Sequence, residues 1–193
     1  MLPVECALRL SGVAGLSSLR RLQMLDKLVP LHRPEGAELA ATGLSVEQQR
    51  AFLDYDPRII EQTLAWLEID GNAFLTPHDP RYSVRLRHIS NFPLILFVQG
   101  DAALLSSPQL AVVGSRHCSH YGREWGSWFC QALALSGLTL TSGLALGVDS
   151  VAHRAALEVQ GKTLAVLGSG LSKVYPARNR LLARQIVDAG GAL

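Results

Sequence analysis

Three short apolar runs in the second half of the sequence each end at a glycine or serine, and each is followed by a helical pattern. The runs span 110–113, 138–141 and 163–167, and the small residues at their ends are Gly114, Ser142 and Gly168. Apolar runs of this length are typical of buried strands, and their alternation with helices predicts right-handed βαβ units. We therefore expect an α/β fold in which the three runs are adjacent parallel strands.

The helices between these runs are marked by their own sequence signals. The first carries Trp125, Trp128, Phe129, Ala132 and Leu133 on one face. We expect Asp149 to be the N-cap of the second helix, and His153, one turn on, to pack or to form a hydrogen bond. Pro176 begins the third helix and Gly190 ends it. Residues 191–193 enter a fourth strand, and because a doubly wound sheet needs more strands, we expect the chain to be truncated relative to a full protein.

The first 70 residues predict a small helical domain of the helix-hairpin-helix or SAM-like kind. Ser45 and Gln48 have the spacing of a capping box, and Pro57 lies near the start of a further helix. The turn at 12–15 reads Gly-x-x-Gly, which either presents backbone N–H groups to a phosphate or connects two helices, and we favour the plain connection. Residues 71–108 form a turn-rich connector with a lead-in strand at 94–98, and 109–193 form the sheet domain.

Charge is distributed unevenly along the chain. Residues 1–108 carry ten Lys/Arg against twelve Asp/Glu, a net of −2, whereas 109–193 carry eight against four, a net of +4. This asymmetry makes the sheet domain the better candidate for an anionic partner, although an ordinary surface imbalance explains the charges equally well.

Cysteine usage and the start of the sequence indicate the cellular compartment. Its three cysteines form no CxxC pair, which favours a reducing, cytoplasmic environment, and its start does not resemble a signal peptide. Residues 125–148 carry no charge and are long enough for a membrane span. Three glycines and several hydroxyl groups interrupt them, so a buried helix, a turn and a strand explain the stretch better, and no membrane contact is expected.

The loops after the three strands are the candidate phosphate site. In open parallel sheets, ligands bind at the carboxyl ends of the strands, where glycine lets the backbone approach an anion. Arg116, two residues past a strand-ending glycine, is placed to bind a phosphate in bidentate fashion. The expected phosphate- or DNA-binding residues are Gly114, Ser115, Arg116, Ser142, Gly143, Gly168, Ser169, Gly170, Lys173, Arg178, Asn179 and Arg180.

No catalytic or cofactor motif accompanies these loops. The first loop lacks G-x-G-x-x-G, no P-loop Lys-Ser/Thr pair is present, and no nucleophile–base set can be identified. His117, Cys118 and His120 lack a further ligand at a suitable spacing, so no zinc is expected. We expect a binding module without cofactor or metal.

Taken together, three motifs resemble those of the DprA/Smf family of DNA-processing proteins. They are Ala111–Arg116 (AVVGSR), Ser142–Asp149 (SGLALGVD) with Ala152-His153, and Leu164–Leu171 (LAVLGSGL) with Tyr175-Pro176 and Asn179. The resemblance implies a Rossmann-like domain that binds single-stranded DNA without sequence preference, protects incoming DNA in natural transformation, and helps to load the RecA recombinase. It also implies a homodimer in the full-length protein.

Two departures from the family pattern stand out. Leu146 occupies a position that is often basic in the family, and the family's later S-E-x-P and N-F-P-x-R-N-R segments are absent. The alternative that stays open is an enzyme on a related fold, a nucleoside-monophosphate phosphoribohydrolase. Its P-G-G-x-G-T-x-x-E loop does not occur up to Leu193.

Overall fold

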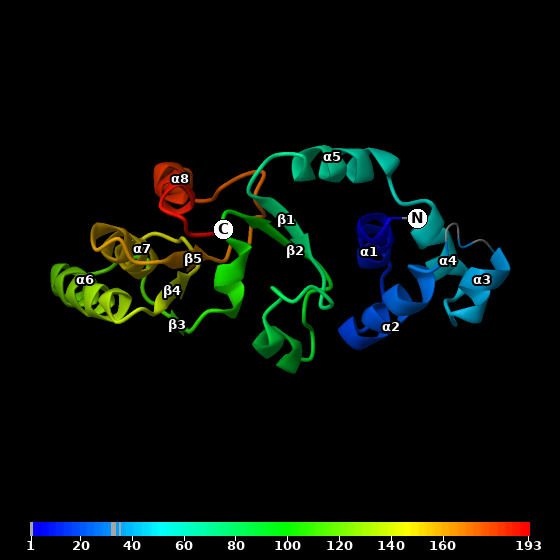
Figure 1. The fold of residues 1–193 in the computed structure, drawn as a ribbon, viewed down its shortest axis with the longest axis horizontal. Helices are drawn as coiled ribbons and strands as arrows, with labels where there is room; N and C mark the ends of the chain where they lie inside the picture. Colours follow the sequence, from blue (N-terminus) through cyan, green and yellow to red (C-terminus); the bar gives the residue numbers. More distant parts are fainter. Residues whose placement is uncertain (1, 32–33, 35) are drawn as a thin grey trace. The chain divides into compact units, whose positions relative to one another are not determined.

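The computed structural model describes residues 2–31, 34 and 36–193 (Figure 1). Residues 32, 33 and 35 of the expected helical segment lie outside this set. The chain divides into two compact units, one up to Leu96 and one from Phe97 onward. The elements of the first unit are α1 (Pro3–Ser11), α2 (Ser18–Leu28), α3 (Gly36–Ala41), α4 (Val46–Leu53), α5 (Pro57–Leu67), β1 (Asn72–Leu75) and the 3₁₀ helix η1 (Val84–His88).

The first unit is helical over most of its length, as the sequence predicts. The capping box at Ser45 is confirmed, because its hydroxyl accepts from the Gln48 amide while the Gln48 side chain accepts from the Ser45 amide at 3.0 Å. Pro57 begins α5. The turn at 12–15 joins α1 to α2, and its carbonyls at Val13 and Ala14 accept hydrogen bonds from Arg21 and Gln48. The core of the unit gathers buried side chains from four helices, including Leu10, Met24, Leu28, Leu39 and Phe52.

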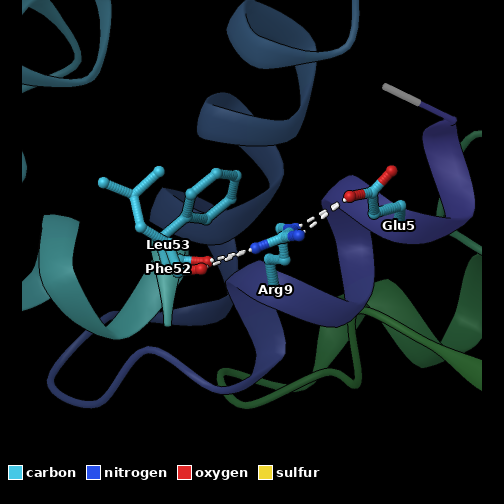
Figure 2. Close-up of polar contacts among 4 residues, drawn as sticks. All are labelled: Glu5, Arg9, Phe52 and Leu53. Atoms are coloured by element: carbon cyan, nitrogen blue, oxygen red, sulfur yellow. Dashed lines mark hydrogen bonds and ion pairs between the residues drawn. The ribbon is translucent and has the colours of Figure 1, made fainter. Parts of the chain in front are cut away.

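Arg9 joins α1 to the C-terminal end of α4. Its Nη1 donates to the carbonyl oxygens of Phe52 and Leu53, each at 3.0 Å, and its Nε donates to Glu5 Oε1 at 3.0 Å (Figure 2). The last carbonyls of a helix have no partner within the helix and carry partial negative charge. The guanidinium therefore satisfies two helix-end acceptors, one of them partly buried, while its bond to Glu5 fixes its orientation.

The second unit contains a three-stranded parallel sheet, as predicted. Its elements are β2 (Leu96–Gln99, which begins in the first unit), η2 (Ala102–Ser106), β3 (Gln109–Ala111), α6 (His120–Leu135), β4 (Thr139–Ser142), α7 (Val148–Glu158), β5 (Thr163–Ala165), η3 (Ala177–Asn179) and α8 (Arg180–Asp188). The strand order is β3-β4-β5, with Leu110 beside Leu140 and Thr141 beside Leu164. The expected lead-in strand at 94–98 is present as β2, which starts two residues later.

The last residues extend the sheet beyond β5. Ala192 forms a parallel bridge with Leu164 and an antiparallel bridge with Gly100. Its amide donates to Thr163 O at 3.2 Å, and its carbonyl accepts from the Ala165 amide at 2.9 Å. A fourth strand position next to β5 is therefore occupied, as the sequence indicates.

The packing of α6 differs from what its sequence suggests. The helix contacts α7 through small side chains, since Cys130 and Ala134 are buried against Ala152, Ala155 and Ala156. Gly161, just after α7, allows this approach, because a Cβ there would lie 2.6 Å from the Ala134 side chain. The apolar face expected from the sequence is mostly exposed: Trp125, Trp128, Phe129 and Ala132 all face solvent. Close helix–helix contact selected the small residues, not the large ones. No helix within the described residues is long and apolar enough to cross a membrane.

Candidate functional site

Three loops follow β3, β4 and β5 at the edge of the sheet where the parallel strands end. They comprise residues 114–118, 143–147 and 166–176 (Figure 1). Because the strands are parallel and adjacent, their carboxyl ends share one edge. The expected site residues Gly114, Ser142 and Gly168 therefore lie at or just beyond one common edge.

The first and second loops are in direct contact. The Val148 amide donates to Ser115 O at 3.1 Å, and a Cβ on Gly147 would overlap that same carbonyl oxygen. Gly147 has φ +78° and ψ −128°, a conformation that side chains with a Cβ avoid. The Ser115 hydroxyl accepts from the His117 amide at 3.0 Å, so it stabilises the turn that carries Arg116.

Asp149 holds the second loop from within. Helix α7 begins at Val148 with Gly147 as its N-cap, so the expectation that Asp149 is the N-cap was wrong. Its buried carboxylate instead accepts from the Gly143 amide at 3.1 Å and from the Ala145 amide at 3.2 Å. Backbone amides that turn toward an anion are the usual feature of a phosphate loop. Here the chain's own carboxylate occupies two of them, so the second loop has fewer amides to offer a ligand.

Asn179 also stabilises the second loop, through its carbonyl groups. Its Nδ2 lies 2.8 Å from Leu144 O, 3.1 Å from Ala145 O and 2.9 Å from Ser150 Oγ. Leu144 adopts φ +58°, a left-handed conformation that costs a residue with a Cβ about 1–2 kcal/mol. The hydrogen bond to its carbonyl offsets part of that strain. The sequence did not predict these positioning roles, although both Asp149 and Asn179 stand in the motifs that resemble the DprA/Smf family.

The expected site residues thus fall into two groups. Ser142 and Asn179 are buried, and the Ser142 hydroxyl donates to Val112 O at 2.6 Å. The others are exposed, including the four cations Arg116, Lys173, Arg178 and Arg180. Within the described part of the chain, none of these four cations forms a hydrogen bond or an ion pair with another residue. Unpaired cations at one sheet edge favour an anionic ligand.

His153 of α7 is fully buried and lies against Thr163, the first residue of β5. Thr163 Oγ1 donates to Leu140 O at 2.7 Å, so it must accept from His153 Nδ1, 2.7 Å away. That assignment puts the proton on Nδ1 and leaves Nε2 as an acceptor that has no partner among the described residues. Burial lowers the pKa of His153 to about 4. The histidine therefore joins α7 to β5 in its neutral form, in agreement with the packing role expected for it.

A parallel sheet with glycine-rich turns and unpaired cations at its carboxyl edge belongs to the Rossmann-like class of ligand-binding folds. Two family models match this chain. The model described as DNA recombination-mediator protein A matches residues 73–193, and the SMF/DprA SAM domain matches residues 1–65. The chain belongs to the DprA/Smf family.

Curated relatives and solved structures agree with this assignment. The chain is 41% identical over 194 residues to protein Smf of Escherichia coli K12, covering 100% of this chain and 52% of that protein. It is 44% identical over 104 residues to DNA processing protein DprA of Streptococcus pneumoniae, covering 54% of this chain and 36% of that protein.

The X-ray structure of DprA from Streptococcus pneumoniae superimposes with a TM-score of 0.70 at 29% identity and covers 95% of this chain and 62% of that one. DprA from Helicobacter pylori, whose structure is described as showing a unique single-stranded DNA binding mode, gives a TM-score of 0.53 at 26% identity. That match covers 63% of this chain and 54% of that one. The chain spans about half the length of the Escherichia coli relative and less of the Streptococcus pneumoniae protein.

Proposed function

We propose that the second unit binds single-stranded DNA without sequence preference through the exposed loops at the carboxyl edge of β3, β4 and β5. The observation that carries this proposal is a group of four exposed cations without partners among the described residues. Arg116 and Lys173 lie on the first and third loops, which also expose glycine backbone, and Arg178 and Arg180 follow the third loop in η3 and at the start of α8. Non-specific binders of single strands follow the phosphate row with a positively charged groove. Membership of the DprA/Smf family and the DNA-binding relative from Helicobacter pylori support the same reading.

We assign different roles to the two groups of site residues. Gly114, Ser115, Arg116, Gly168, Ser169, Gly170, Lys173, Arg178 and Arg180 are exposed and are proposed to face the DNA backbone. Gly143 is exposed, but its amide already donates a hydrogen bond to Asp149. Gly143 therefore has no free amide for a DNA phosphate and contributes mainly to the shape of the loop. Ser142 and Asn179 are proposed to act indirectly, by fixing the second loop.

We also propose a domain organisation and binding partners for this chain. Residues 1–70 would form a helical accessory domain, 71–108 a connector, and 109–193 the first part of the DNA-binding domain. The proposed role is protection of incoming DNA and transfer of that DNA to the RecA recombinase in recombination, by binding and not by catalysis. Homodimerisation is proposed for the longer proteins of the family.

Arg116→Ala tests the proposed interface. Loss of one desolvated, bidentate phosphate contact would weaken binding of every oligonucleotide by roughly ten- to a hundred-fold, because charged hydrogen bonds contribute about 1.5–3 kcal/mol. It would also flatten the slope of log affinity against log salt by about 0.7, the value expected for one phosphate of a single strand. Fluorescence anisotropy with labelled oligonucleotides of several sequences, at four or more salt concentrations, measures both quantities.

Arg58→Ala is the matched control. Arg58 is an exposed arginine of the first unit that pairs with Asp56 at 3.0 Å, and its replacement should leave affinity and slope unchanged. If Arg116→Ala folds normally by circular dichroism and binds DNA with the parent affinity and slope, the carboxyl edge of the sheet is not the DNA site.

A further inference from the structure

The exposed side of α6 carries four aromatic side chains in a single stripe. Tyr121, Trp125, Trp128 and Phe129 are spaced at i, i+4, i+7 and i+8, which places them on one face of the helix. They expose 67%, 54%, 63% and 54% of their surface. Helix α6 is held to the sheet and to α7 by Cys130 and Ala134. The stripe therefore contributes little to holding α6 in the fold, and exposed apolar patches of this kind mark binding surfaces.

Three of these rings form a row. The centroids of Tyr121 and Trp125 are 5.8 Å apart with an interplanar angle of 52°, and those of Trp125 and Trp128 are 5.6 Å apart at 83°. Each ring therefore restricts its neighbour, which lowers the entropy lost when a ligand settles on the row. The row begins at the first turn of α6, directly after the loop that carries Arg116. It is thus continuous along the chain with the interface proposed above.

A groove of about 510 Å³ runs beside the far end of the row, between α6 and α7. It is lined by Arg123, Glu124, Ser127, Trp128, Gln131, Val151, Arg154 and Glu158. Both carboxylates have neighbours, because Glu158 accepts from Gln131 at 2.8 Å and Glu124 lies 3.5 Å from His120. In the described part of the chain, Arg123 and Arg154 have no such partner. The two arginines and two glutamates of the lining balance in formal charge, but both guanidinium groups are free to contact the phosphates of a nucleic-acid backbone.

We propose that the aromatic row of α6 is a stacking platform for the bases of single-stranded DNA, with Arg123 and Arg154 beside it as backbone contacts. This inference rests on the proposed function and adds a second contact surface to it. Unpaired bases present π faces of any sequence, and exposed aromatic side chains next to cations are the surface on which non-specific binders stack them. The row would place bases beyond the loop that holds the phosphates, so one strand engages both surfaces.

Tryptophan fluorescence of the full 193-residue chain tests the platform. In a Trp66→Phe background only Trp125 and Trp128 emit. Titration with oligo(dT) should quench this emission to saturation, whereas an abasic oligonucleotide of equal length and charge should bind more weakly and quench little. Trp128→Ala should weaken oligo(dT) binding by about five- to a hundred-fold, the effect of losing one stacked base. It should leave abasic binding and the salt slope unchanged, and Trp128→Phe should retain most of the affinity.

Leu135→Ala is the control on the same helix. Leu135 is an exposed apolar residue without a ring, 71% accessible, and its loss should change nothing. If Arg116→Ala weakens binding while Trp128→Ala does not, the platform is refuted and the proposed function stands. If no oligonucleotide binds, both fail. The platform is also overturned if oligo(dT) causes no quenching and sedimentation velocity shows a dimer that Trp128→Ala dissociates, since the row would then be a protein interface.

Discussion

Replacing Asn179 with alanine would remove the side chain that hydrogen-bonds the second loop and Ser150 from the end of η3. The amide nitrogen has two hydrogens and three acceptors within 3.1 Å, namely Leu144 O, Ala145 O and Ser150 Oγ. It therefore makes about two full hydrogen bonds at a time. The side chain is 2% exposed, so water cannot replace these bonds without opening the fold.

The expected loss of stability can be worked out from these contacts. Leu144 O is buried and would be left without its side-chain partner, which costs about 1–3 kcal/mol. Ala145 O still accepts from the Ser150 hydroxyl at 2.6 Å, so the loss of its hydrogen bond with Asn179 costs about 1 kcal/mol or less. We expect Asn179→Ala to lower the free energy of unfolding by about 1–4 kcal/mol, and to weaken DNA binding as the second loop loses its shape. Asn179→Asp keeps the size but turns acceptor oxygens toward two carbonyls, so its loss should be at least as large.

Urea denaturation followed by circular dichroism, with oligonucleotide affinity measured on the same samples, provides the assay. Arg178→Ala is the matched control, because Arg178 precedes Asn179 in η3 and is exposed. It should keep the parent stability within about 0.5 kcal/mol, as surface changes do, and lose DNA affinity. A stability of Asn179→Ala within the same 0.5 kcal/mol would refute the tethering role, since three contacts of this geometry cannot be lost from a buried site at no cost.

Three further changes test other parts of the structure. Gly147→Ala should be strongly destabilising, because the added Cβ would overlap Ser115 O. Gly170→Ala has open space around its Cβ, so it should lose only the cost of the left-handed conformation, about 1–2 kcal/mol. Equal losses of stability for the two variants in urea denaturation would contradict this. The pKa of His153 is about 4 in the folded chain, against a usual value of 6.5. As the pH falls, the unfolded chain therefore takes up a proton at this histidine before the folded chain does. The free energy of unfolding should fall by about 3 kcal/mol between pH 6.5 and pH 4. His153→Gln should lack this component, and identical pH profiles would rule it out. Arg9→Ala should lower the stability of the first unit by about 2–3 kcal/mol in thermal unfolding, through loss of its two helix-end carbonyl contacts, and a midpoint equal to that of the parent would disprove that.

Local patterns in the sequence were sufficient for the architecture. The alternation of apolar runs and helices predicted adjacent parallel strands, and β3, β4 and β5 confirm it. The capping box at Ser45 and the start of α5 at Pro57 were also predicted correctly. These features depend on interactions between residues within a few positions of one another, so a short segment of the sequence is enough to predict them.

Helix α6 shows where such patterns are insufficient. Periodicity identifies a stripe of large apolar residues, and the usual inference is that this stripe is buried. In the fold, Gly126, Cys130 and Ala134 face α7, because small residues allow two helices to approach closely and pack. The sequence of α6 offers two faces that could be buried, one aromatic and one of small residues. Which face is buried depends on α7, which lies some twenty residues further along the chain.

At the proposed binding edge, too, some features follow from the sequence and others from the packing. Local sequence patterns were enough to predict that three glycine- and serine-rich loops follow parallel strands, and that Arg116, Lys173, Arg178 and Arg180 accompany them. The contacts that Asp149 makes with two loop amides, and that Asn179 makes with loop carbonyls 35 and 34 residues before it, depend on the folded arrangement of the chain. A buried polar group must find a partner, and which partner it finds depends on the crossovers that bring distant segments together. Residue type therefore predicts the chemistry available at the edge, whereas the packing of the loops determines which groups remain free to bind a ligand.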